Sequence, residues 1–176
     1  MPTSPELLIV ADPPSLFRAA AEEFVSQASA AVKANGRFTV ALSGGSTPKS
    51  LFTLLASKDR DRLPWTRMFF FWGDERHVPP HHPDSNYRMA YEALLSKVPV
   101  PEENIFRVPA ENPDANRAAA DYEQTLRQFF KLSAGAFPRF DLIRMRRPPR
   151  GHSQTFLPTS CVLLAVKARP GGAMQE

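Results

Sequence analysis

The stretch FTVALSGGSTPKSLF, residues 38–52, joins a strand-like run to a helix-like run through a turn rich in glycine and hydroxyl side chains. Phe38–Leu42 is continuously apolar except for one threonine and predicts a buried strand. Thr47 and Pro48 are expected to open the next helix, since Thr caps free N–H groups and Pro is tolerated at the first helical position. The pattern therefore places the glycine turn between the end of a strand and the start of a helix.

Similar strand-like and helix-like segments alternate along the rest of the chain. Strands are expected at 7–10, 38–42, 68–72, 105–108 and 140–143, and helices at 15–33, from 47 onward, at 84–96 and at 114–131. Strands that alternate with helices indicate a parallel sheet with right-handed crossovers. We therefore predict an α/β fold with a mostly parallel, doubly wound, Rossmann-like sheet that is incomplete at its C-terminal end.

The composition is that of a globular protein of one domain. The chain has 176 residues, of which 43% are hydrophobic and 23% charged, and these are ordinary values. No apolar stretch approaches the roughly 18 residues that a membrane span needs, and no basic-then-apolar leader opens the sequence. The single cysteine, Cys161, excludes an internal disulfide and fits a reducing compartment, so we expect a cytoplasmic protein with no membrane partner.

The positive charge of the chain is concentrated at its C-terminal end. Residues 1–143 contain 16 Lys and Arg against 17 Asp and Glu, whereas residues 144–176 contain six basic residues against Glu176. The segment RMRRPPR after Ile143 cannot continue a buried strand, because Pro does not donate to a ladder and buried guanidinium groups need partners. We therefore divide the chain into an α/β domain, 1–143, and a basic tail, 144–176.

A basic tail can mark an arm that binds nucleic acid or a membrane surface, or a segment of different origin. Single-stranded nucleic acid is usually bound by aromatic side chains interleaved with basic ones. Phe156 is the only aromatic residue of this tail, so we expect no nucleic-acid partner. The residues leave the oligomeric state open.

The glycine turn has the composition of a phosphate cradle. Gly44 and Gly45 allow the backbone to approach an anion closely, while Ser43, Ser46 and Thr47 add hydroxyl donors at the start of a helix, where N–H groups and partial positive charge favour anions. A tight turn with a threonine cap is the alternative interpretation. A Walker loop is excluded, because the Gly-Lys-Ser/Thr ending is missing.

A second cluster of polar residues lies in FFFWGDERHVPPHHPDSNYRMAYEALL, residues 69–95. Asp74, Glu75 and Arg76 directly follow a buried strand, which places them at the same edge of the sheet as the glycine turn; an exposed salt bridge at a strand end is the alternative. Three histidines follow, at His77, His81 and His82. They are interleaved with prolines and so lack the helical i, i+4 geometry of many zinc ligands, and we expect solvated loop histidines and no metal.

These two stretches resemble a known family. ALSGGSTPKSLF and FFWGDERHVPPHHPDSNYRMAYEALL are similar to the 6-phosphogluconolactonases, which share a fold with the glucosamine-6-phosphate deaminases. The resemblance continues through VPEENIFRVPAENPDANRAAADYEQTLRQFF to FDLI and covers residues 1–143. The deaminases typically have Asp-Glu-Tyr where this chain has Asp74-Glu75-Arg76, so the lactonase branch is the better match.

The resemblance implies hydrolysis of 6-phosphoglucono-1,5-lactone to 6-phosphogluconate in the pentose phosphate pathway, without a cofactor. By similarity, Ser43 to Thr47 would hold the phosphate of the sugar, and Arg76 would lie near the lactone and balance developing negative charge. Asp74 would orient Arg76 or a sugar hydroxyl. The attacking water needs a general base, and histidine suits pH 7.

The expected position of that base is where the sequence departs from the family. Relatives run from FDLI into a Gly-Met-Gly-Pro-Asp-Gly-His-Thr-type loop, whereas residues 144–158 read RMRRPPRGHSQTFLP. Counting from Asp141, Gly151 and His152 fall in the register of the family's Gly-His, so His152 is the candidate base. A reading-frame change near codon 144 is one hypothesis for the departure, and a truncated, inactive relative that binds sugar phosphate is the alternative function.

Overall fold

The computed structural model describes residues 10–143, so residues 1–9, residues 144–176, most of the strand expected at 7–10 and the candidate base His152 lie outside the described residues. Eight helices and strands follow one another in the described part: α1 (Pro13–Asn35), β1 (Phe38–Leu42), α2 (Ser46–Ser57), β2 (Met68–Trp72), α3 (Asn86–Ala93), β3 (Ile105–Phe106), α4 (Ala115–Phe130) and β4 (Leu142–Ile143). Short 3-10 helices lie at Arg60–Arg62, Trp65–Arg67, Leu95–Lys97 and Glu102–Asn104. None of these helices is long and apolar enough to cross a membrane.

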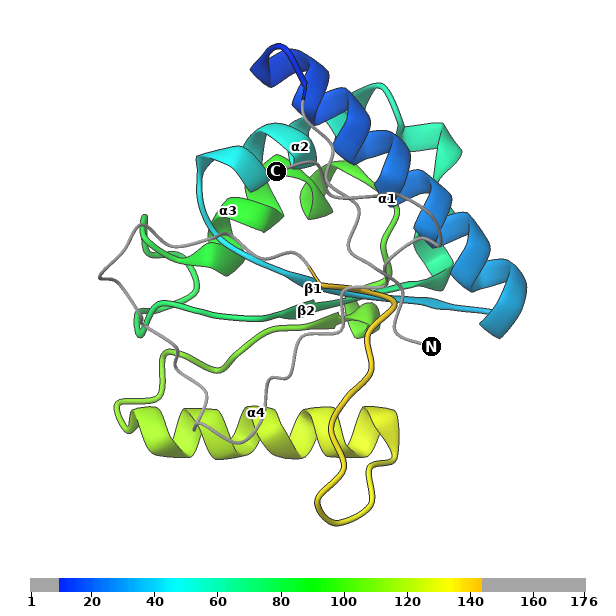
Figure 1. The fold of residues 1–176 in the computed structure, drawn as a ribbon. Coiled ribbons are helices and arrows are strands. Elements are labelled where there is room, and N and C mark those ends of the chain that lie inside the picture. Colours follow the sequence, from blue (N-terminus) through cyan, green and yellow to red (C-terminus); the bar gives the residue numbers. More distant parts are fainter. Residues whose placement is uncertain (1–9, 144–176) are drawn as a thin grey trace, which may run out of the picture.

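The strands form one parallel sheet in the order β3-β2-β1-β4. Helices α1, α2 and α3 cover one face of this sheet and α4 covers the other (Figure 1). The predicted parallel, doubly wound arrangement is therefore confirmed. The strand order runs outward from β1 through β2 to β3 and then returns to the opposite side of β1, where β4 pairs with it.

The sheet separates two apolar clusters, because alternate residues of a strand point to opposite faces. Val40, Leu42 and Phe70 belong to the larger cluster, together with buried residues of α1, α2 and α3. Phe71 belongs to the smaller cluster, with Tyr122 and Leu126 of α4. All five residues of β1 are buried, as expected for a central strand that is covered on both faces.

The two long helices, α1 and α4, lie within two residues of their predicted bounds. The Asp12 side chain accepts a hydrogen bond from Ser15 N at the start of α1, and Gly36 ends this helix in the left-handed region at φ 71°. Asp114 caps α4, because its side chain accepts hydrogen bonds from Asn116 N and Arg117 N. Helix α2 differs from its prediction, because it begins at Ser46 and no side chain caps it. Its N-cap is Gly45 at φ 111°, a conformation that glycine adopts readily and other residues rarely do. Since the helix begins at Ser46, Thr47 lies within its first turn.

The two edge strands are shorter than predicted, and tertiary contacts explain both. Continuing β3 would pair Trp72 with residue 107, but the Tyr122 hydroxyl donates to Trp72 O (2.9 Å) and accepts from Trp72 N (2.8 Å) instead. Strand β4 is fixed by Asp141, whose Oδ2 accepts from the main-chain N and the hydroxyl of Thr39, each at 2.8 Å. These hydrogen bonds hold the chain beside β1 at Asp141, one residue before β4 begins at Leu142.

Candidate functional site

The glycine turn and the Asp74–Arg76 segment leave the sheet side by side. Leu42 and Trp72 are the last residues of β1 and β2 and share one register position, and Gly73 N donates to Leu42 O at 2.9 Å. This carboxyl edge also contains the point where the strand order reverses, between β1 and β4. In doubly wound sheets, ligands bind in the crevice at such a point.

The first turn of α2 presents N–H donors at this edge that have no partner within residues 10–143. Gly45 supplies no capping side chain, Pro48 has no N–H, and the first helical hydrogen bond is from Lys49 N to Gly45 O at 3.1 Å. Ser46 and Thr47 are exposed. Ser43 is buried, and its Oγ has no hydrogen-bond partner within the described residues. A helix start with free N–H groups and neighbouring hydroxyls is suited to an anion.

A single side chain, Asn86, joins the glycine turn to Asp74. A Cβ atom on residue 44 would lie 1.8 Å from Asn86 Oδ1, so only glycine leaves room for this amide. Asn86 Nδ2 donates to the main-chain O of Asp74 (3.1 Å) and to Asp74 Oδ2 (3.3 Å). The N–H of Gly44 also hydrogen-bonds the Asp74 carboxyl. The two sequence motifs therefore meet in one hydrogen-bonded unit.

The surroundings of Asp74 change the pKa of its carboxyl. Burial raises the pKa of the Asp74 carboxyl above its usual range, and the positive charge of Arg76 and the hydrogen bonds from Asn86 and Gly44 oppose this effect. Arg76 is exposed, so its guanidinium faces solvent at the sheet edge. A carboxyl and a guanidinium that interact beside an uncapped helix start form a surface suited to a polar, anionic ligand.

Glu75 has a different role from its two neighbours. It is buried, and its carboxylate accepts hydrogen bonds from four donors at 2.7–3.3 Å: Arg76 N, Asn86 N, Tyr87 N and Ser85 Oγ. Two of these donors are the first N–H groups of α3, so the carboxylate lies at the positive end of that helix. Glu75 therefore fixes α3 against the end of β2.

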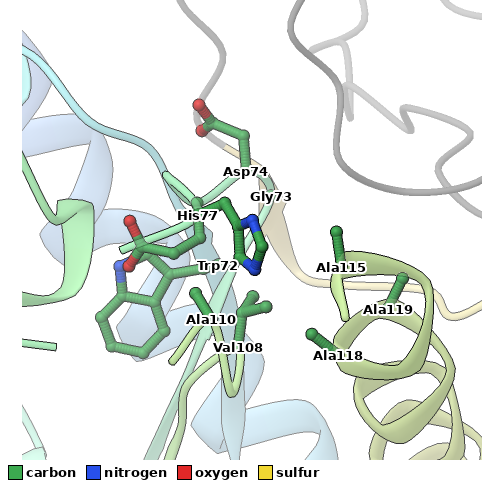
Figure 2. A pocket seen from close by; sticks show the side chains of 10 residues that line it. Trp72, Gly73, Asp74, His77, Val108, Ala110, Ala115, Ala118 and Ala119 are labelled. Carbon is green, nitrogen blue, oxygen red and sulfur yellow. The ribbon is translucent and has the colours of Figure 1, made fainter. Parts of the chain in front are cut away.

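A small cavity lies beside this unit, between the end of β2 and the first turns of α4 (Figure 2). Its volume of about 20 Å³ gives room for one water molecule. Ala115, Ala118 and Ala119 form its helix side, and the Asp74 carboxylate points away from them in Figure 2. The cavity is too small to hold a ligand of several atoms, so we take the open edge above β1 and β2, where the start of α2 meets Asp74 and Arg76, as the candidate site.

Two of the loop histidines, His77 and His82, contact the backbone through their rings. His77 Nε2 lies 2.6 Å from Asn112 O, and His82 Nδ1 accepts from Asp84 N at 3.2 Å. Within residues 10–143, no group of three or more His, Cys, Asp or Glu side chains is arranged to hold a metal ion. The structure thus brings together Ser43 to Thr47, Asp74 and Arg76 at one edge, while His152 lies outside the described residues.

The sequence pattern assigned no role to Asn86, and it did not distinguish the role of Glu75 from the roles of Asp74 and Arg76. The available signal was the SNYR segment of the second motif, which places a capping serine and an amide at the start of a helix. That signal predicts a helix start, but not which strand ends the helix contacts. Those contacts come from the packing of α3 beside β2.

Known proteins resemble this chain in sequence and in fold. Residues 11–169 match the family described as glucosamine-6-phosphate isomerases/6-phosphogluconolactonase. A 6-phosphogluconolactonase of Nostoc is 40% identical over 150 residues, which are 85% of this chain and 61% of that protein. The 6-phosphogluconolactonase of Synechocystis is 46% identical over 128 residues, 73% of this chain and 52% of that protein.

The solved structures agree with the sequence comparison. The crystal structure of 6-phosphogluconolactonase from Leishmania guyanensis superposes with a TM-score of 0.74 at 29% identity, over 89% of this chain and 65% of that one. This chain therefore spans between about half and two thirds of the length of these three relatives. On the family match and these likenesses together, the chain belongs to the glucosamine-6-phosphate isomerase/6-phosphogluconolactonase family.

Proposed function

We propose that this protein hydrolyses 6-phosphoglucono-1,5-lactone to 6-phosphogluconate, a step of the pentose phosphate pathway. Its relatives in Nostoc and Synechocystis are named 6-phosphogluconolactonases. The observation that carries the proposal for this chain is the uncapped start of α2 beside Asp74 and Arg76. It supplies anion donors and a charged pair at one edge, as a phosphorylated lactone requires.

In this proposal, the segment from Ser43 to Thr47 binds the phosphate group. The free N–H groups at the start of α2 and the hydroxyls of Ser46 and Thr47 donate to phosphate oxygens, and the helix adds partial positive charge. The Ser43 hydroxyl, which has no hydrogen-bond partner among the described residues, is a further donor at the base of the turn. The alternative of a threonine-capped turn is not supported, because α2 has no side-chain cap.

We assign the end of the site that contains Asp74 and Arg76 to the lactone ring. A water oxygen attacks the carbonyl carbon, a base takes the proton of that water, and the bond to the ring oxygen breaks as this oxygen leaves with a proton. Arg76 stabilises the negative charge that develops on the carbonyl oxygen. Asp74 orients Arg76 or a sugar hydroxyl. His152 is our candidate for the base, on its register with the family loop alone.

Hydrolysis uses water as the only co-substrate, so the reaction as proposed has no cofactor. We place the protein in the cytoplasm, where its single cysteine would remain reduced. Its proposed partner is the small sugar-phosphate lactone, with neither a nucleic acid nor a membrane.

The test is direct measurement of lactone hydrolysis by the purified full chain. The product is oxidised by an NADP-dependent dehydrogenase, so NADPH absorbance reports turnover. We expect hydrolysis well above the spontaneous rate. A well-folded chain, as judged by circular dichroism, that gives no acceleration would contradict the proposal.

A second candidate function is binding of a sugar phosphate without turnover. The sequence RMRRPPR after Ile143, where relatives have a glycine-rich loop, favours this candidate. It predicts that 6-phosphogluconate perturbs the amide resonances at the start of α2 while the lactone is hydrolysed at the spontaneous rate. The two candidates therefore differ in turnover and agree in phosphate binding.

A further inference from the structure

Asn86 is a buried residue whose side-chain amide donates hydrogen bonds to Asp74 and none to its own helix. It is the first residue of α3 and is 5% exposed. The start of α3 is already satisfied, because Ser85 accepts from Arg88 N and the Glu75 carboxylate accepts from Asn86 N and Tyr87 N. Capping therefore does not require an amide side chain at position 86.

The amide instead lies between the two segments of the proposed site. Its oxygen lies in the space that any side chain on residue 44 would occupy, and its Nδ2 group holds both the main chain and the carboxylate of Asp74. A shift of this side chain would release both segments together. An apolar residue of similar size would fill the space but would leave Asp74 without these two donors.

We propose that Asn86 is a positioning residue, which sets the glycine turn and the Asp74 carboxylate at a fixed separation and orientation for the reaction. The inference rests on the proposed lactone hydrolysis, and it adds a residue that acts through Asp74 and Gly44 without contacting the reacting atoms. Small errors in such positioning are costly, because a misplacement of about 1 Å can reduce a rate on the order of 10²-fold.

The inference makes a prediction about pH that a merely structural role does not. Hydrogen bonds to Asp74 Oδ2 favour the charged carboxylate, so loss of the Asn86 amide raises the pKa of Asp74. If turnover uses ionised Asp74, the acidic limb of kcat/KM against pH then moves to higher pH. The other groups near this carboxyl are Arg76, Glu75 and His77, and the substitution changes none of them.

The primary experiment compares Asn86→Ala with Asn104→Ala. Asn104 is a matched control because it is also 5% exposed and donates to one main-chain oxygen, Thr66 O at 3.3 Å, ahead of the amino ends of β2 and β3. For the folded Asn86→Ala variant we expect kcat to fall on the order of 10²-fold, with a smaller change in KM and the acidic limb at higher pH. We expect Asn104→Ala to keep the kcat and pH profile of the unchanged protein per folded molecule.

A second pair of variants separates space filling from hydrogen bonding. Gly44→Ala places a methyl group against the Asn86 amide, so it should lower the thermal midpoint, and adding Asn86→Ala should restore much of this loss because it removes the clashing atoms. The double variant should still lack the normal pH profile. These measurements also serve if Asn86→Ala alone fails to fold.

Two measurements that do not depend on turnover distinguish failure of the positioning role from failure of the proposed function. The ¹³C resonance of the Asp74 carboxyl gives its pKa, and hydrogen exchange at Gly44 reports the hydrogen bond from its N–H. If the unchanged protein is inactive, the proposed function fails, while a raised Asp74 pKa and faster Gly44 exchange in Asn86→Ala would still support the positioning role. An unchanged Asp74 pKa and unchanged Gly44 exchange, or equal effects of Asn86→Ala and Asn104→Ala per folded molecule, would overturn it.

Discussion

Helices α2 and α3 start at the same edge of the sheet, and their first turns have opposite uses. Helix α3 is closed: Ser85 caps it, and the buried Glu75 carboxylate accepts from its first two N–H groups. Helix α2 is open: Gly45 offers no capping side chain, and there is no acidic residue in its first turn. Both ends attract anions. One is filled by the protein's own carboxylate and stabilises the fold, while the other has no side-chain cap and in our proposal binds the phosphate of the ligand.

We expect the largest effect when the Glu75 carboxylate is removed from the start of α3. Glu75→Ala leaves four donors around a buried space, so we expect the free energy of unfolding to fall by about 3 kcal/mol or more, since each unsatisfied group costs about 1–3 kcal/mol. Urea denaturation measures this change. Glu75→Gln keeps the shape of the side chain and should lose less. A loss below about 1 kcal/mol for Glu75→Ala would show that α3 does not depend on this carboxylate.

The adjacent residue should give the opposite pattern. Arg76→Ala removes an exposed side chain, so the free energy of unfolding should change by no more than about 0.5 kcal/mol. Turnover should fall on the order of 10²-fold, because the developing oxyanion loses its charge partner. Steady-state kinetics on the lactone, beside urea denaturation, measure both quantities. Equal activity in Arg76→Ala would remove this residue from the mechanism.

The open helix start depends on the backbone of Gly45. At φ 111° and ψ 170° this residue is in a region that is nearly restricted to glycine, so Gly45→Ala should cost about 1–3 kcal/mol of stability. It should also weaken phosphate binding, because the strain shifts the first turn of α2. Gly135→Ala is a control, since Gly135 has φ 74° but lies between α4 and β4. Gly135→Ala should lose stability and keep phosphate binding.

The smallest expected effect compares one serine at each helix start. Ser85→Ala removes a cap and should cost about 1 kcal/mol, whereas exposed Ser46 caps nothing and Ser46→Ala should stay within about 0.5 kcal/mol. For ligand binding the order should reverse, with the larger loss of phosphate affinity in Ser46→Ala. Thermal unfolding with and without 6-phosphogluconate gives both values. The same order in both measurements would remove the distinction between the two helices.

Local patterns were sufficient to predict most of the fold. Phe38–Leu42 and Met68–Trp72 are strands with the predicted bounds, because each is a continuous buried run that ends at a turn or a charged segment. Gly36 and Asp114 mark helix ends through their own conformational and capping preferences. The length of β3 could not be predicted locally, since the Tyr122 hydroxyl that replaces it comes from α4.

The candidate site was predicted by residue type and only partly by role. The sequence placed Ser43 to Thr47 and Asp74 to Arg76 at one edge, but it assigned Gly44 to the approach of an anion, whereas the structure shows the Asn86 side chain against this residue. The buried role of Glu75 depends on donors 10–12 residues later, which a local pattern does not connect to it. His152 stays a prediction, because it lies outside the described residues.

The most direct test of the open and closed helix starts is an NMR titration of the ¹⁵N-labelled full chain with 6-phosphogluconate. Our account predicts saturable shifts of the Gly45, Ser46 and Thr47 amides and a shift of the Arg76 guanidinium, while the Asn86 and Tyr87 amides remain bonded to Glu75 and move little. Shifts centred on the start of α3, with the start of α2 unchanged, would contradict it.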